Sequence, residues 1–204
     1  MSKPCLMLAL LLTAGAPPVN AQTDYYARAG AVGASNLLRD IIVSANTASE
    51  ITVRQSIAPM VALGGSVAIA PRYRAGLEAT LASGSYQSEE SGVEADLGTL
   101  RTGSLMLGLE GPIAGDFRWR AGLGALLYLP SEETGIFLSG GATRWLAGAG
   151  ADYRRPILSS WDLMASMRYD FHRFTTGELE RRDFSQAQGV SRISLSVGLA
   201  RGLR

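Results

Sequence analysis

The segment Trp161–Phe174 alternates between apolar and polar side chains along its whole length. Successive side chains of a β-strand point to opposite faces, so this pattern predicts a strand with one face in an apolar medium. The apolar face carries an aromatic residue at each end, and the opposite face is mostly polar or charged. A helix would mix Asp162, Tyr169 and Arg173 into any apolar stripe, which argues against helical structure here.

Two environments fit such a strand. In a soluble sandwich the apolar face would cover a core. In a membrane barrel the same face would contact lipid. The aromatic ends favour the membrane, because aromatic side chains gather at both membrane interfaces. The length also favours it, because strands of outer-membrane barrels alternate over segments of about 10 residues.

Length and composition limit how the chain could enter a membrane. The 204 residues suggest one domain, and 47% of them are hydrophobic. Beyond the N-terminus, however, the sequence has no apolar run long enough to span a bilayer as a helix. A membrane form of this chain would therefore be a β-barrel.

The N-terminus has the pattern of a secretory signal. Lys3 supplies a positive charge, Leu6–Leu12 forms a short apolar run, and Val19–Ala21 resembles a cleavage site. We expect residues 1–21 to be a cleaved signal peptide and residues 22–204 to form one barrel domain. The mature chain would lose Cys5, the single cysteine, which excludes disulfides and cysteine-based metal or catalytic sites. It would also be formally neutral, which gives no electrostatic reason to expect nucleic acid as a partner.

The remaining chain repeats the alternation. We predict an all-β fold with eight strands, at residues 25–38, 57–70, 73–82, 104–110, 117–129, 144–153, 161–174 and 192–200. The facing of the first strand is unresolved, because both of its alternate sets are mostly small. The connections are long after odd-numbered strands, including the polar stretch 83–99, and short after even-numbered strands. This asymmetry predicts an antiparallel up-and-down transmembrane β-barrel with short periplasmic turns and longer outer loops.

Strand parity places both signs of charge on the inward face. The predicted lumen charges are Glu78, Glu110, Arg120, Arg144, Asp152, Arg168, Asp170 and Arg192. Charges inside a barrel must be paired or hydrated, because isolated buried charge is costly. An eight-stranded barrel is only just wide enough to hold side chains. We therefore predict an ion-pair network that fills the lumen, with a narrow pore for small or hydrophobic solutes as the alternative.

Aromatic residues mark the two expected membrane interfaces. The predicted lipid-interface aromatics are Tyr73, Trp119, Tyr128, Trp145, Tyr153, Trp161, Tyr169 and Phe171. Phe117 would join the periplasmic group and Tyr86 the outer group. Aromatic side chains at both rims are typical of transmembrane barrels.

This pattern resembles the small eight-stranded outer-membrane barrels, the group of the outer-membrane protein A membrane domain and its X-type and W-type relatives. Their terminal signal for the assembly machinery is matched at Ser196, Gly198 and Leu203, whereas Arg201 and Arg204 depart from it. The resemblance implies a non-enzymatic structural or surface-interaction role in the cell outer membrane. It also implies a monomer without cofactor or metal, whose partners are outer-membrane lipids or lipopolysaccharide, periplasmic chaperones and the barrel assembly machinery.

A second reading makes the chain a rim enzyme acting on outer-membrane lipid. His172, the single histidine, would lie near the outer rim. The deacylase type of such enzymes has His-x-Ser on one strand, but Phe174 stands at the serine position. Ser185 with Glu178 or Glu180 could supply a nucleophile and an acid only as loop residues without a defined geometry. We therefore predict no enzymatic activity. The acidic outer loops could also bridge divalent cations to lipid headgroups, although they lack the spacing of a calcium loop.

Overall fold

The computed structural model describes residues 23–44, 47–133, 135–138, 140–176, 179 and 187–203, and side chains of residues 40–49 are not described. The predicted signal peptide, the predicted first mature residue Gln22 and the terminal Arg204 lie outside these ranges. So do Glu178, Glu180 and Ser185.

The described residues form ten strands and one short 3-10 helix. The strands are β1 (Thr23–Ala34), β2 (Leu38–Ser44), β3 (Thr47–Gln55), β4 (Ala58–Ala70), β5 (Tyr73–Glu90), β6 (Val93–Ala114), β7 (Phe117–Pro130), β8 (Ala142–Leu158), β9 (Trp161–Phe174) and β10 (Gln188–Leu203), and the helix is η1 (Gly135–Phe137). In the described part of the chain, no helix has the length and hydropathy needed to cross a membrane.

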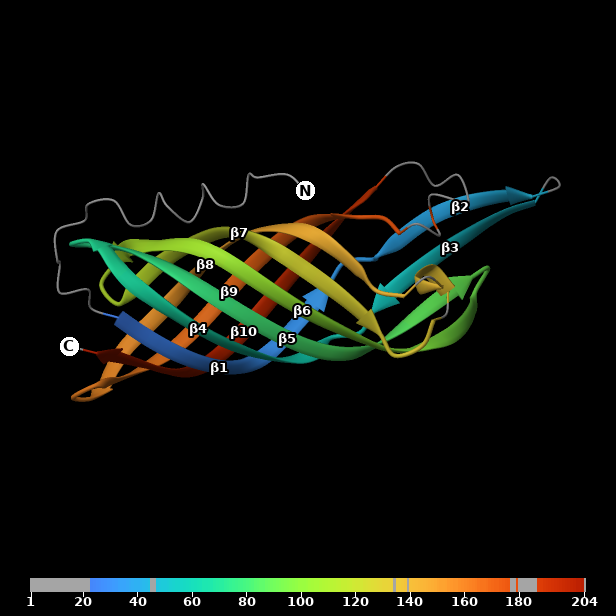
Figure 1. Cartoon of the computed structure of the whole chain (residues 1–204). Helices are drawn as coiled ribbons and strands as arrows, with labels where there is room; N and C mark the ends of the chain where they lie inside the picture. The colour runs from blue at the N-terminus through green and yellow to red at the C-terminus, as the bar shows by residue number, and fades with distance from the viewer. Residues whose placement is uncertain are drawn as a thin grey trace, which may run out of the picture.

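Eight of the strands close into a ring. Around it the order is β1, β4, β5, β6, β7, β8, β9 and β10, and every neighbouring pair is antiparallel. The first and last strands complete the ring, with Thr23 opposite Leu203 and Ala34 opposite Arg192. The predicted eight-stranded up-and-down antiparallel barrel is therefore confirmed (Figure 1).

The two ends of the barrel differ as predicted. Three short turns, at residues 71–72, 115–116 and 159–160, lie at the end where β1 begins and β10 ends (Figure 1). The opposite end carries the longer connections, including η1 and the β2–β3 hairpin. We call these the turn end and the loop end.

Two predicted connections are more ordered than expected. The polar stretch 83–99 was predicted as a loop, but β5 and β6 continue through it and pair up to Glu90 opposite Val93. Ser91 and Gly92, with φ of 50° and 82°, make the two-residue turn, a geometry that suits the right-handed twist of the strands. The prediction of a loop was wrong because the glutamates were taken as a sign of a loop. Charged side chains also fit a β-hairpin in which both faces are polar.

The segment after the first strand also contains a hairpin that was not predicted. Strands β2 and β3 pair with each other, and β3 pairs with β5 from Ile51 opposite Glu90 to Gln55 opposite Tyr86. The strands β2, β3, β5 and β6 thus form a sheet that projects beyond the barrel at the loop end (Figure 1). We call it the projecting sheet.

A side-chain amide ties the projecting sheet to the barrel. The side-chain Oε1 of Gln188 accepts a hydrogen bond of 2.9 Å from the backbone N–H of Arg39, and its side-chain Nε2 donates one of 2.8 Å to the Arg39 backbone carbonyl. These are the two bonds that a neighbouring strand would make. The backbone pairing of β1 with β10 ends at Ala34 and Arg192. Beyond that point, the Gln188 side chain keeps β10 in contact with the segment that follows β1.

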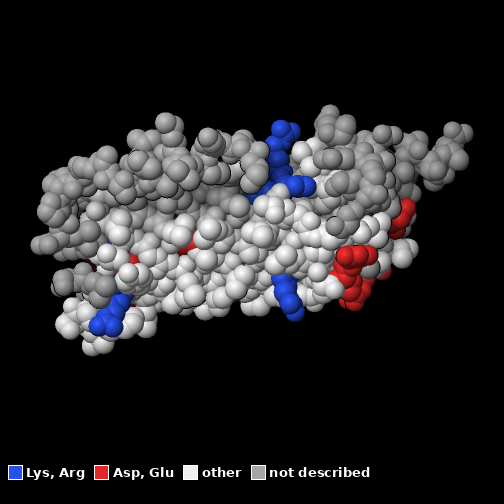
Figure 2. All heavy atoms as spheres, viewed as in Figure 1, with Lys and Arg blue, Asp and Glu red and all other residues white. Residues whose placement is uncertain are grey.

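The outward face of the barrel is apolar. Leu63, Leu107, Leu123 and Val197, from four different strands, each remain more than 60% exposed. Figure 2 shows a middle zone with few charges, while acidic side chains gather near the end that carries the β5–β6 hairpin. So wide an apolar surface around the whole ring is expected where lipid covers it.

Four inward-facing glycines form a row across one side of the barrel. Gly76, Gly108, Gly122 and Gly148 lie directly opposite one another across β5, β6, β7 and β8. A Cβ atom on Gly148 would lie 2.1 Å from Oδ1 of Asp170, its neighbour on the adjacent strand β9. The bare backbone at Gly148 therefore leaves space for the Asp170 carboxylate.

Strand parity can be tested at the centre of β9. Replacing Ala165 with Arg should lower the free energy of unfolding by about 2–4 kcal/mol, because the cation would enter the middle of the apolar band. Ala165→Leu adds bulk without charge and is the matched control. Urea unfolding after refolding into lipid vesicles measures both. Equal stability of the two variants would contradict a lipid-facing Ala165.

Candidate functional site

Glu78 on β5 lies at the centre of the lumen and is 4% exposed. Its carboxylate accepts hydrogen bonds from Arg28, Arg120 and Arg168, on β1, β7 and β9. The Tyr26 hydroxyl donates a further bond of 2.8 Å to the same carboxylate and accepts one of 2.6 Å from Arg120. One buried carboxylate thus joins four strands that are far apart in the sequence.

The ion pairs extend from Glu78, through Arg120 and Arg168, to carboxylates on β8 and β9. Arg120 Nη2 lies 2.9 Å from Oδ2 of Asp152, and the Asp152 carboxylate also accepts a 2.6 Å bond from the Ser166 hydroxyl. Arg168 donates two bonds, of 3.0 and 2.9 Å, to Oδ2 of Asp170. Each of these carboxylates therefore forms an ion pair with an arginine, which a buried charge requires.

A second group of pairs closes the turn end. Glu110 on β6 contacts Arg74 at 3.3 Å, Arg154 at 3.4 Å and Arg120 at 3.2 Å. Asp24 on β1 contacts Arg74 at 3.2 Å and Arg154 at 3.0 Å. Because Arg120 binds both Glu78 and Glu110, the two groups form one network.

The network is balanced in charge. Its members are the arginines Arg28, Arg74, Arg120, Arg154 and Arg168 and the carboxylates Asp24, Glu78, Glu110, Asp152 and Asp170. Five charges of each sign leave no surplus inside this part of the lumen. We call this set the lumen network.

The structure places six of the eight predicted lumen charges in the lumen network. Arg144 and Arg192 lie elsewhere: Arg144 donates to the backbone carbonyls of Thr143 and Thr175, and Arg192 donates to the Thr102 hydroxyl at 3.1 Å. Neither forms an ion pair within 4.0 Å among the described residues. The prediction of one network for all eight residues is therefore wrong for these two.

Four members of the lumen network were not predicted. Arg28 was missed because both faces of the first strand are rich in Ala and Gly, so its parity could not be assigned. Arg74 lies within the predicted strand 73–82 and has the parity of Glu78, but it was overlooked. Asp24 and Arg154 lie one residue outside the predicted strands 25–38 and 144–153. Extending strand parity by one residue would have found Arg154.

The lumen network leaves very little open space. A cavity of about 30 Å³ lies beside Glu78, Arg120 and Arg168. That volume holds roughly two water molecules. The polar half of the lumen is therefore filled by its own side chains.

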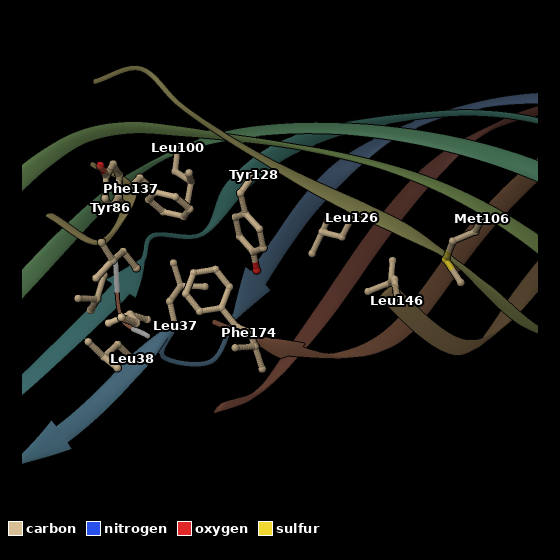
Figure 3. Packing of buried hydrophobic residues seen from close by; sticks show 14 residues of the cluster. Leu37, Leu38, Tyr86, Leu100, Met106, Leu126, Tyr128, Phe137, Leu146 and Phe174 are labelled. Atoms are coloured by element: carbon tan, nitrogen blue, oxygen red, sulfur yellow. The ribbon is translucent and has the colours of Figure 1, made fainter. Parts of the chain in front are cut away.

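The loop-end half of the lumen is filled by apolar side chains. The cluster contains Leu37, Leu38, Val53, Tyr86, Leu100, Met106, Leu126, Tyr128, Ile136, Phe137, Leu146, Phe174, Leu179 and Val190 (Figure 3). Barrel strands supply part of it, and the connections at the loop end supply Leu37, Ile136, Phe137 and Leu179. We call this set the apolar plug, because it occupies the mouth of the barrel.

Phe137 of η1 holds the connection between β7 and β8 in the apolar plug. Its ring centroid lies 5.9 Å from those of Tyr86, Tyr128 and Phe174, and it meets Tyr86 and Phe174 edge to face. These distances are typical of attractive aromatic pairs. The Phe137 side chain is 1% exposed although it belongs to a short helix. The helix η1 therefore covers the mouth of the barrel, and we call it the lid.

Two of the predicted interface aromatics lie inside the barrel. Tyr128 and Tyr86 are 1% and 0% exposed and belong to the apolar plug. The prediction was wrong for Tyr128 because it was assigned by its height along β7, although strand parity points it inward with Leu126. Tyr86 was placed at the outer rim because residues 83–99 were read as a loop.

The other predicted interface aromatics lie on the outward face. Tyr73, Trp145, Tyr169 and Phe171 are between 44% and 86% exposed. Trp119, Tyr153 and Trp161 are half-buried by neighbours, which include Tyr73, Phe117 and the guanidinium of Arg201. These residues form two outward groups, one toward each end.

His172 lies under the apolar plug rather than at an open rim. The side chain is 2% exposed, and its Nε2 lies 2.6 Å from the Tyr128 hydroxyl. Among the described residues, no serine forms a hydrogen bond with His172. No group of three or more His, Cys, Asp or Glu side chains in the described ranges could hold a metal ion.

The fold has clear counterparts among solved structures. AlkL in lipid bilayers aligns with a TM-score of 0.57 and 12% identity over 94% of each chain. Neisserial surface protein A aligns with 0.52 and 12% identity, over 88% of this chain and 96% of that chain. OprG from Pseudomonas aeruginosa aligns with 0.51 and 13% identity, over 90% and 97%. No protein-family model matches the sequence, and comparison with curated proteins finds no match.

The chain has the fold of the small eight-stranded outer-membrane barrels. At 12–13% identity this likeness describes the architecture alone, so it assigns no ligand or partner to the lumen. The small outer-membrane barrel fold predicted from the repeated alternation is confirmed. The contents of this barrel have to be interpreted from its own residues.

Removal of the central charge tests the lumen network. Glu78→Gln keeps the side-chain shape but leaves Arg28, Arg120 and Arg168 facing a neutral group. We expect a loss of about 3–5 kcal/mol in unfolding free energy, as for other buried ion pairs that lose one partner. Glu94→Gln is the control, since its pair with Arg54 is about half exposed and should contribute less than about 1 kcal/mol. Similar urea midpoints for the two variants would contradict a central role for Glu78.

Proposed function

We propose that the protein is a closed, non-enzymatic barrel of the bacterial outer membrane that presents the projecting sheet at the cell surface. The observation that carries this proposal is that described side chains occupy both the turn-end half and the loop-end half of the lumen. The lumen network fills the turn-end half, and the apolar plug fills the loop-end half. A barrel filled in this way acts as a membrane anchor for what it displays.

The exterior supports a membrane location. The apolar band encircles the ring, and outward aromatic side chains lie toward both ends. An N-terminal segment with the pattern of a signal peptide fits secretion across the inner membrane. Assembly would then involve periplasmic chaperones and the barrel assembly machinery, with outer-membrane lipids or lipopolysaccharide around the finished barrel.

The projecting sheet supports a role at the surface. It carries exposed ion pairs between Arg39 and Glu50 and between Arg54 and both Glu89 and Glu94. These pairs surround a polar hollow that includes Asn36, Thr52 and Ser91. A charged, solvated sheet of this kind suits contact with polar partners outside the cell.

A narrow pore is the second function considered. The side chains in the lumen argue against a pore, because an ion would have to displace both the lumen network and the apolar plug. A rim enzyme is the third, and the burial of His172 beside Tyr128 gives it no open catalytic site.

Planar-bilayer recording tests whether the lumen is closed. The refolded protein should insert without producing discrete conductance steps, because the cavity beside Glu78 is only about 30 Å³. A detergent blank and a general porin provide the negative and positive controls. Regular single-channel steps from the folded protein would overturn the closed-barrel proposal.

Cysteine labelling of cells tests the orientation. Val93→Cys, at the tip of the projecting sheet, should react with a membrane-impermeant maleimide on intact cells. Arg72→Cys, in a turn at the opposite end, should react only after the outer membrane is opened. Both residues are exposed, so a reversed pattern would place the projecting sheet in the periplasm.

A further inference from the structure

Among the described residues, the region just beneath the lid holds a surplus of positive charge. Arg192 is 5% exposed and Arg144 is half-buried, and both lie outside the balanced lumen network. Their charges act on the same two side chains, Tyr128 and His172. Asp170 lies opposite Arg192 in the β9–β10 register, but Arg168 already binds it through two hydrogen bonds.

His172 adds an unused hydrogen-bonding atom to this region. Its Nε2 is taken by the Tyr128 hydroxyl, while Nδ1 is buried and has no hydrogen-bond partner in the described part of the chain. The Nε atom of Arg144 is likewise buried without a partner among these residues. Native proteins rarely leave such groups unsatisfied, and each one calls for a specific explanation.

The space above these groups is apolar, and the lid contributes one aromatic side chain to it. The Phe137 ring lies among Tyr86, Tyr128 and Phe174, all of which belong to barrel strands, whereas Phe137 itself comes from the short helix η1 (Figure 3). Phe137 therefore occupies an aromatic cage as a tethered ligand would. If η1 lifts, the cage becomes an apolar ring-sized site above Tyr128, His172 and Arg192.

We propose that the mouth of the barrel is a binding site for a small amphipathic carboxylate. Its apolar group replaces Phe137 in the cage of Tyr86, Tyr128 and Phe174, and its acidic group is bound by Arg192 and His172. The acid neutralises the surplus charge and gives the buried His172 ring a partner. This site goes beyond the display role of the closed barrel and does not depend on it, because binding requires the lid to lift but requires no passage through the lumen network.

The probe is 3-phenylpropionate, with 3-phenylpropan-1-ol as the neutral ligand of matched shape. Calorimetric titration is carried out on the refolded full chain in detergent micelles, with empty micelles as the blank. Phe137→Ala should bind the acid about tenfold more tightly than the wild type, because binding no longer has to displace the ring. Leu138→Ala is the control, since this neighbouring side chain is 44% exposed and should leave the affinity unchanged.

The charge requirement is tested in the Phe137→Ala background. Adding Arg192→Gln should remove the preference for the acid over the alcohol while the alcohol still binds. His172→Gln is a second variant that should weaken binding of the acid, and it keeps the proposal testable if Arg192→Gln does not fold. Heat-dependent gel mobility verifies folding of each variant, and bilayer recording tests the closed barrel separately.

Three results would overturn the proposal. The first is equal affinity for acid and alcohol in Phe137→Ala. The second is the same affinity in Phe137→Ala and Leu138→Ala. The third is a heat of titration that, for every variant, equals the heat of partition of the probe into empty micelles.

Discussion

The carboxylate of Glu78 is the interaction on which the interior depends. It collects Arg28, Arg120 and Arg168 from three other strands, and the Tyr26 hydroxyl bonds both Glu78 and Arg120. Such a cluster is stable only when the charges balance, because buried ions lose their hydration. The five arginines and five carboxylates of the lumen network meet that condition. At Gly148 the bare backbone leaves space for the Asp170 carboxylate.

The two halves of the barrel interior are thus stabilised by different interactions. Toward the turns, ion pairs hold the strands together, whereas toward the loops an apolar cluster resembles the core of a soluble protein. Arg144, Arg192 and His172 lie outside the balanced lumen network, near the apolar plug. The polar groups that lack partners are found at this boundary as well as within the lumen network. The proposed ligand site lies where the charge balance ends and the lid begins.

Strand parity predicted most of the barrel from the sequence. It gave the ring of eight strands, the outward face and six members of the lumen network, because alternation is a direct result of strand geometry. It failed where parity was not legible, as in the Ala- and Gly-rich β1, which contributes Arg28. Parity was not followed for Tyr128, whose height along β7 suggested an interface, and it was not applied to Tyr86, because residues 83–99 were expected to form a loop. The apolar plug could not be predicted, since Leu37, Phe137 and Leu179 reach it from connections without any periodic pattern.

The register of the lumen network has a consequence for the order of folding. Arg28 and Glu78 are 50 residues apart, Glu78 and Arg168 are 90 apart, and Asp24 and Arg154 are 130 apart. A single hairpin contains few of these pairs, so a chain that is partly assembled carries arginines and carboxylates that have not yet met. Neutralisation comes late, when the first strand meets the last, because contacts between distant residues form only after the loops between them close. Strand insertion and ring closure are therefore coupled events, and the apolar environment favours the complete ring over any open intermediate.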